Sequence, residues 1–213
     1  MQKNNAFIFW GISLVILVLF VWMIVNLATP SNKPQIINLD INANDIIKGN
    51  DTAQYTLLEY SDFQCPACAT YQPLVKKLSE EFPNDLKIVF RNFPLSEIHP
   101  NANISAYAAQ AASLQGKFWE MADILFSRQA DWSAEEKPQE KFISYAQELS
   151  LDIEKFKTDM DSAAVKDKVS KDRLSAESNN LNSTPTFFVN GQKINNPGSY
   201  NEFKNAIFAD QNK

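Results

Sequence analysis

The longest uninterrupted apolar run in the chain lies near its start. Residues 7–28 read FIFWGISLVILVLFVWMIVNLA and contain no charged side chain. A helix of about 20 apolar residues is long enough to cross the hydrocarbon core of a membrane. The run exceeds the apolar region of a cleavable secretory signal, and the residues that follow it form a poor cleavage site. The pattern therefore predicts an uncleaved transmembrane signal anchor over residues 6–28, between a tip at residues 1–5 and a linker at residues 29–34.

After the linker, short apolar runs and one helical stripe predict strands around a single helix. Pro73 falls inside that helix and is expected to kink it. The predicted elements are an edge strand at 36–41, an irregular stretch at 45–50, a buried strand at 55–60, a helix continuing to about residue 82 and an alternating strand at 86–90.

From about residue 98 to residue 181 the apolar spacing becomes helical. Ser133 and Glu136 have the spacing of a capping box, which predicts that a helix begins there. The other predicted helices cover residues 106–114, 118–126, 153–160 and 163–181. An uninterrupted helical block between two strand-bearing parts indicates an insertion into a sheet fold.

The end of the chain returns to strands. Two apolar runs, at 186–189 and 192–194, flank Asn190-Gly191, and this pattern predicts a hairpin with a type I′ turn. Ser199 and Glu202 form a second capping box before a last helix. The predicted order is β-β-α-β, a helical block, then β-β-α.

Composition excludes several classes of function. The net charge of −5 and the pI near 5.0 argue against nucleic-acid binding, which requires clustered positive charge. The chain has no glycine-rich phosphate loop and only one histidine, His99. Two cysteines and one histidine cannot complete a four-ligand zinc site, so no metal is expected. His99 stands before a proline and is interpreted as a structural residue.

The only two cysteines, Cys65 and Cys68, lie three residues apart between a predicted strand and a predicted helix. A sulfur at a helix N-terminus is stabilised as a thiolate by backbone N–H groups and the helix dipole. Pro66 suits the first helical turn, where its missing N–H would have been unpaired. The placement favours a redox-active pair over a structural disulfide, half of a metal site or two buried thiols.

Two motifs together carry a resemblance to a known family. The residues LEYSDFQCPAC at 58–68 and TPTFFVNG at 184–191 resemble those of a DsbA-type thiol–disulfide oxidoreductase. The similarity is to the membrane-anchored, Gram-positive-like branch of that family and covers roughly residues 35–210. It implies an α/β thioredoxin fold with an inserted helical domain at about 98–181, within a single domain over residues 35–213.

The resemblance also implies roles for individual residues. Cys65 is expected to be the nucleophile and Cys68 the resolving thiol, with the disulfide between them as the only redox group. Glu59 would transfer protons beneath them, since a buried carboxylate has a raised pKa. Pro185 would form a cis peptide bond. Substrate is expected to contact three residues around a shallow apolar groove: Thr184, Pro66 and Phe63.

One residue departs from the family pattern. Well-known periplasmic members carry a histidine between the cysteines, whereas this chain has Ala67 at that position. The thiolate therefore lacks that donor and depends on the helix dipole and on backbone contacts. How oxidising the pair is does not follow from the sequence.

The function implied is that of a monomeric dithiol oxidase, which introduces disulfide bonds into exported unfolded proteins with free thiols. A membrane quinone-linked thiol oxidoreductase would re-oxidise it. The catalytic domain would lie outside the cell membrane and the N-terminus in the cytoplasm, because a dithiol oxidase works on the oxidising face. The alternatives are a disulfide reductase or isomerase of the same fold, a copper chaperone that uses the two thiolates, and a peptide-binding or chaperone module.

Overall fold

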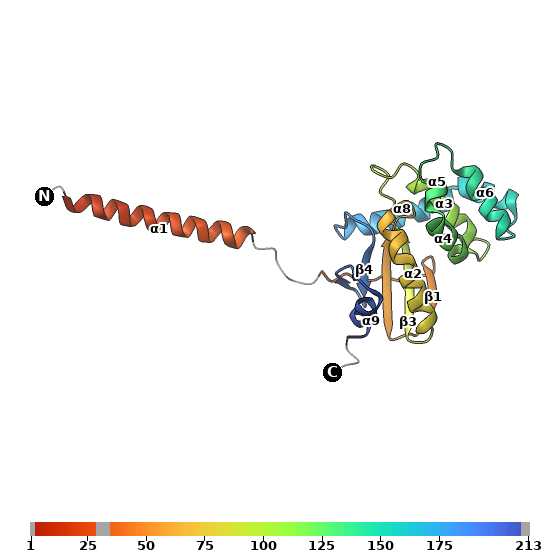
Figure 1. Cartoon of the computed structure of the whole chain (residues 1–213), viewed down its shortest axis with the longest axis horizontal. Helices are drawn as coiled ribbons and strands as arrows, with labels where there is room; N and C mark the ends of the chain where they lie inside the picture. Colours follow the sequence, from red (N-terminus) through yellow and green to blue (C-terminus); the bar gives the residue numbers. More distant parts are fainter. Residues whose placement is uncertain (1–2, 29–34, 210–213) are drawn as a thin grey trace. The chain divides into compact units, whose positions relative to one another are not determined.

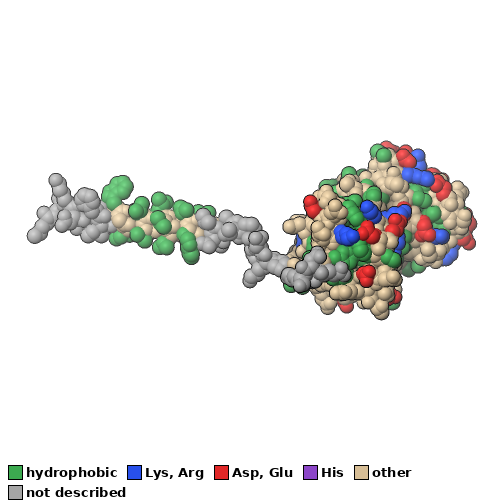
Figure 2. Space-filling view, turned by 60° about the horizontal axis from the view of Figure 1, so that its bottom comes forward, with side chains coloured by type: hydrophobic (Ala, Val, Ile, Leu, Met, Phe, Trp, Pro, Cys, Tyr) green, Lys and Arg blue, Asp and Glu red, His purple; other side chains and the backbone are tan. Residues whose placement is uncertain are grey.

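The computed structural model describes residues 3–28 and 35–209, with side chains at residues 10–24 and 35–209. The chain divides into two compact units, residues 1–34 and 35–213. In the first unit, α1 (Lys3–Ala28) is one helix, and its described side chains from Trp10 to Ile24 are exposed and mostly apolar (Figure 2). Within the described ranges, no helix has the length and apolarity of a membrane span. The predicted transmembrane helix is therefore not confirmed.

The second unit is built on a five-stranded mixed sheet (Figure 1). The strand order across the sheet is β1-β3-β2-β4-β5, and only β2 and β3 run parallel. A parallel pair needs a crossover connection, and α2 (Pro66–Glu81) supplies it. The strands are β1 (Ile46–Gly49), β2 (Tyr55–Ser61), β3 (Leu86–Asn92), β4 (Thr186–Val189) and β5 (Gln192–Ile194).

Helices pack on both faces of the sheet because the central strand β2 is buried on both sides. Leu57 faces a cluster that includes side chains of α2 and α9 (Tyr200–Phe208). Leu58 faces the opposite cluster, with Ala176 of α8 (Ala163–Ser178). Alternation along one strand thus directs side chains into two separate cores.

The helical block between β3 and β4 packs around a third core, which also includes Phe63, Cys65, Cys68 and Phe90. Its helices α3 to α6 lie together at one end of the sheet (Figure 1). Five alanines of α3 are fully buried, which allows the close approach of α4 that the structure shows. The block comprises α3 (Ala102–Ser113), α4 (Phe118–Ser127), α5 (Gln129–Trp132), α6 (Gln139–Glu148), α7 (Ile153–Asp161) and α8.

The predicted order of strands and helices is confirmed, but two predicted elements are wrong. Residues 36–41 form no strand: Ile36 makes only an isolated bridge with Gln192. The edge strand is instead β1, within the stretch predicted to be irregular, where Ile46 pairs with Phe90. Alternation of apolar and polar residues shows that a segment can form a strand, but it does not identify the strand with which that segment pairs.

The second error concerns Ser133, which does not begin a helix. Ser133 ends α5, and the next helix begins at Gln139. The carbonyl oxygen of Ser133 accepts a hydrogen bond from Gln64 Nε2 at 2.8 Å, next to the cysteine motif. This long-range contact determines the local backbone, and it has no signature in the sequence.

The C-terminal hairpin and helix cap are as predicted. Asn190 and Gly191 have φ angles of 46° and 86°, as the left-handed residues of such a turn require. A Cβ atom at Gly191 would lie 2.6 Å from the carbonyl oxygen of Ile37, so the position requires glycine. The Ser199 side chain accepts a hydrogen bond from the Glu202 amide and caps α9.

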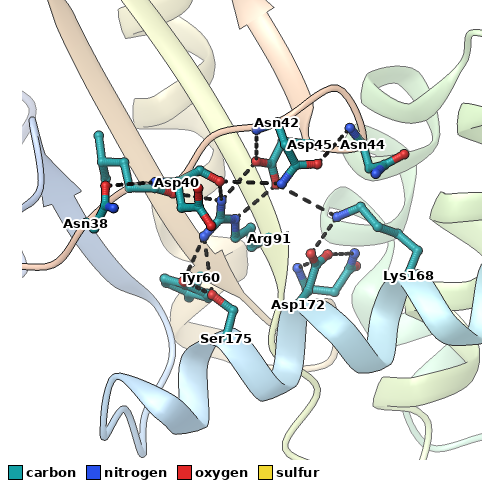
Figure 3. Close-up of polar contacts among 12 residues, drawn as sticks. Asn38, Asp40, Asn42, Asn44, Asp45, Tyr60, Arg91, Lys168, Asp172 and Ser175 are labelled. Atoms are coloured by element: carbon teal, nitrogen blue, oxygen red, sulfur yellow. Dashed lines mark hydrogen bonds and ion pairs between the residues drawn. The ribbon is translucent and has the colours of Figure 1, made fainter.

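A buried polar network ties α8 to the sheet (Figure 3). Arg91 of β3 forms an ion pair with Asp45 at 2.9 Å, and both side chains are almost fully buried. The Arg91 guanidinium also donates hydrogen bonds to Tyr60 Oη and Ser175 Oγ, each at 3.2 Å. On α8, Lys168 pairs with Asp172, which accepts a hydrogen bond from the Asn92 amide. The helical block is therefore anchored on the strand that neighbours β2.

Candidate active site

The two cysteines lie where β2 gives way to α2. Cys65 is the N-cap residue of α2 and Pro66 its first helical residue. Cys65 is 7% exposed, whereas Cys68, one turn further, is fully buried. The structure holds both as free thiols. Cys65 is therefore the thiol that a second molecule can reach, and Cys68 is shielded behind it.

The surroundings of Cys65 favour its thiolate. A hydrogen bond with the Cys68 side chain is the largest cause that lowers the pKa of Cys65, to about 5, against the opposing effect of burial. Thr184 and the backbone amides of Cys68 and Ala67 lower this pKa further. The dipole of α2 and these backbone amides stabilise the thiolate whichever side chain lies between the cysteines. The site thus stabilises a thiolate with Ala67 in place of the family's histidine.

The surroundings of Cys68, in contrast, favour its neutral thiol. Burial raises the pKa of Cys68 well above its usual range, and the neighbouring Cys65 raises it further. A hydrogen bond from the Asp62 amide to Cys68 Sγ, at 3.5 Å, is among the opposing causes. At neutral pH the pair therefore consists of a thiolate at Cys65 and a thiol at Cys68.

The second motif meets the first at Thr184. When Cys65 is protonated, its thiol donates a hydrogen bond to the Thr184 carbonyl oxygen at 3.4 Å, across 119 residues of sequence. The Thr184–Pro185 peptide bond is cis. The Asn196 side chain donates a hydrogen bond to the Pro185 carbonyl at 3.0 Å, which holds the loop in front of β4. The predicted residues Cys65, Thr184 and Pro185 are therefore brought together.

Glu59 lies in β2, buried on the face that α2 covers. It is fully buried, pairs in register with Phe90 and Phe187, and has no hydrogen-bond partner for either carboxylate oxygen in the described part of the chain. Desolvation by burial raises the pKa of Glu59 from 4.5 to about 7. Such a carboxyl group can exchange protons near neutral pH.

The predicted role of Phe63 in substrate binding is wrong. Its side chain is 1% exposed and stacks on Phe90, with ring centroids 5.4 Å apart, while Phe126 packs beside it at 4.8 Å. An aromatic side chain after a strand can face either the groove or the core. Here it faces the core, where aromatic side chains of α4 pack against it. Pro66 and Ala67, in contrast, are exposed.

Three residues of the site were not predicted from the sequence. Gln129 of α5 donates hydrogen bonds from Nε2 to the carbonyls of Phe63, at 2.7 Å, and Cys65, at 3.1 Å. Asp62 is buried next to Cys68, and His99, interpreted as a structural residue, bonds to it at 2.7 Å. The contacts of Gln129 and His99 join segments far apart in the chain, so no local pattern could have revealed them.

Residues 42–209 match the thioredoxin family model, and the chain belongs to that family. The asymmetric thiol pair and the cis-proline loop both lie within the residues that match this family model. The membrane-anchored branch expected from the sequence is not confirmed.

Solved structures from bacteria have a similar fold. BdbD from Bacillus subtilis is 25% identical with a TM-score of 0.70, and the match covers 80% of this chain and 94% of that chain. A double cysteine-to-alanine variant of alpha-DsbA1 from Wolbachia pipientis is 20% identical with a TM-score of 0.71, and the match covers 79% of this chain and 91% of that chain. At that lower identity the likeness extends to the fold alone.

Curated relatives of higher identity are much longer proteins. The Na(+)/H(+) antiporter NhaA 1 of Salinispora arenicola is 38% identical over 157 residues, which are 74% of this chain and 23% of that protein. The antiporter NhaA of Herminiimonas arsenicoxydans is 38% identical over 196 residues, with coverage of 89% and 30%. The chain thus spans about a quarter of the length of these relatives, and their transport activity is not transferred to it.

Proposed function

We propose that this protein is a dithiol oxidase that introduces disulfide bonds into exported proteins. The observation that carries the proposal is the opposite shift of the two thiol pKa values, lowered at Cys65 and raised at Cys68. A stabilised Cys65 thiolate favours the reduced form of the pair, and a pair that prefers to be reduced is a strong oxidant of other thiols.

The reaction begins with the disulfide form. A substrate thiolate attacks Cys65 Sγ, the Cys65–Cys68 bond breaks, and Cys68 leaves with the electron pair. Glu59, buried below and titrating near neutral pH, is the proton donor for this poor leaving group. A second substrate thiolate then attacks the substrate sulfur of the mixed disulfide and releases Cys65 as a thiolate. Two electrons pass from the substrate to the enzyme.

Substrate enters beside the loop that contains Thr184. The exposed Pro66 and the Thr184 backbone flank Cys65, so an extended peptide can place a cysteine against Sγ. Contacts through backbone do not select side chains, which suits unfolded proteins that carry free thiols as substrates.

Re-oxidation and location complete the proposal. A membrane quinone-linked thiol oxidoreductase accepts the electrons, and the enzyme works as a monomer, without nucleic acid and with no redox group besides its disulfide. The charge-free apolar run at residues 7–28 supports anchoring in the cell membrane, with the N-terminus in the cytoplasm and the catalytic unit outside. Protease treatment of intact cells should digest residues 35–213 and spare the N-terminus.

The test of function compares oxidation with reduction. The oxidised full chain in mild detergent is mixed with a reduced, unfolded secreted protein, and the gain in disulfide bonds is followed by alkylation and mass spectrometry. The wild type should transfer one disulfide per molecule, and Cys65→Ser none. Faster reduction of insulin by the dithiol form than oxidation by the disulfide form would instead assign the protein to the reductases. Stoichiometric Cu(I) binding with no exchange would assign it to the copper chaperones.

A further inference from the structure

The loop between β2 and α2 contains a carboxylate that the reaction above does not use. The side chain of Asp62 is fully buried and accepts three hydrogen bonds. The Gln64 amide donates to Oδ1 at 2.8 Å, the Leu95 amide donates to Oδ2 at 3.0 Å, and His99 Nδ1 lies 2.7 Å from Oδ2. A buried carboxylate is costly unless it is fully hydrogen-bonded, so these partners hold Asp62 in one position.

The backbone of the same residue contacts the resolving thiol. The Asp62 amide donates a hydrogen bond to Cys68 Sγ at 3.5 Å. The side chain of Asp62 therefore anchors the peptide group whose N–H is directed at the buried sulfur. Any partner that fixes this side chain also fixes that N–H.

His99 is the only side chain among the partners of the Asp62 carboxylate in the described part of the chain. Since each carboxylate oxygen already accepts a backbone N–H, the His99 ring donates from Nδ1. His99 lies in the segment after β3, which also supplies Leu95, and its side chain is 16% exposed. It thus connects a segment outside the cysteine motif to the loop above Cys68.

We propose that His99 is a positioning residue of the thiol pair: through Asp62 it holds the backbone N–H that prepares Cys68 to attack the mixed disulfide. The inference rests on the proposed thiol–disulfide exchange. In this step Cys68 gives its proton to the Glu59 carboxylate and attacks Cys65 Sγ. The Cys65–Cys68 bond forms, the bond between Cys65 and the bound thiol breaks, and that thiol leaves as a thiolate that takes up a proton from water. The N–H stabilises the negative charge on Cys68 before the attack.

The effect is specific to Cys68. The groups that stabilise the Cys65 thiolate are the Cys68 side chain, Thr184 and the amides of Ala67 and Cys68. The Asp62 side chain bonds to none of them. Loss of His99 should therefore slow the attack by Cys68 and leave the reactivity of Cys65 unchanged. A general loosening of the fold would change both.

The experiment uses the full chain in mild detergent with glutathione bound to Cys65 as a mixed disulfide. Release of glutathione by Cys68 is followed in stopped flow, and iodoacetamide alkylation of Cys65 is measured separately on the reduced chain. His99→Ala should slow release about fivefold, the effect of one lost hydrogen bond, with alkylation unchanged. His99→Asn, whose amide can donate from nearly the place of Nδ1, should recover most of the rate.

A matched control variant removes an ion pair of the same segment that does not involve Asp62. Glu97 pairs with Arg173 at 2.9 Å on the exposed side of this segment, so Glu97→Gln should release glutathione at the wild-type rate. In an Asp62→Asn background, which already disturbs the anchor, His99→Ala should add little. Should His99→Ala not fold, His99→Gln, whose amide is displaced from the position of Nδ1, takes its place and should be slow where His99→Asn is fast.

Three results would overturn the inference: wild-type release in His99→Ala, equal slowing of release and alkylation, or equal slowing in His99→Asn and His99→Ala. These results are distinct from failure of the proposed function. If the wild type itself does not release glutathione, exchange is refuted whatever the variants show.

Discussion

Replacing Glu59 by glutamine should stabilise the protein, and the gain should grow with pH. Glutamine keeps the size of the side chain and cannot ionise. In the wild type, burial raises the pKa of Glu59 from 4.5 to about 7, so the folded chain binds a proton that the unfolded chain has lost between these two pH values. The contribution of Glu59 is fully present below pH 4.5 and is lost as the pH rises through about 7.

The size of the effect follows from the shift. One pKa unit corresponds to about 1.4 kcal/mol, so the shift to about pH 7 amounts to about 3 kcal/mol in total. Of this, about 2 kcal/mol falls between pH 5.5 and pH 8.5. The free energy of unfolding of Glu59→Gln relative to wild type should therefore rise by about 2 kcal/mol over that range.

The assay is guanidinium chloride unfolding of the reduced chain, followed by tryptophan fluorescence at several pH values. Glu80→Gln serves as the control, because Glu80 is an exposed glutamate of α2, and its difference from wild type should change little with pH. A difference between Glu59→Gln and wild type that stays constant from pH 5.5 to 8.5 would refute the assignment of a near-neutral titration to Glu59.

Three further results are expected. The rate of Cys65 alkylation should rise with pH around a midpoint near 5, and a midpoint near the ordinary thiol value would contradict the stabilised thiolate. Phe63→Ala should lower the free energy of unfolding by about 3–5 kcal/mol, as for an aromatic side chain lost from a core. A loss below about 1 kcal/mol would contradict the burial of Phe63 in the core. Asp45→Asn should destabilise the protein by about 3–5 kcal/mol, because Arg91 is left as a buried charge without its ion pair; near wild-type stability in urea unfolding would show that the pair contributes little.

The sequence was informative where the structure depends on neighbours along the chain. The turn at Asn190-Gly191 and the cap at Ser199 follow from local backbone preferences, and both are present. The cysteine motif is equally local, since its spacing and Pro66 place Cys65 at the start of a helix. Such features need no knowledge of the tertiary structure.

The sequence was misleading where the outcome depends on distant partners. The edge strand is β1 at Ile46–Gly49, not residues 36–41, because β3 is available to pair with it. Phe63 is buried because Phe90 and Phe126 converge on it. The contact of His99 with Asp62 crosses 37 residues. Pairing and burial of this kind are properties of the folded chain.

The central claim is that the Cys65–Cys68 pair is oxidising although Ala67 replaces the family's histidine. The most direct test is its reduction potential, measured by equilibrating the full chain in glutathione buffers and trapping the free thiols by alkylation. The proposal predicts a potential at or above about −230 mV, within or above the range of the glutathione couple. A value near about −270 mV, as in thioredoxin, would contradict it and identify the protein as a reductase.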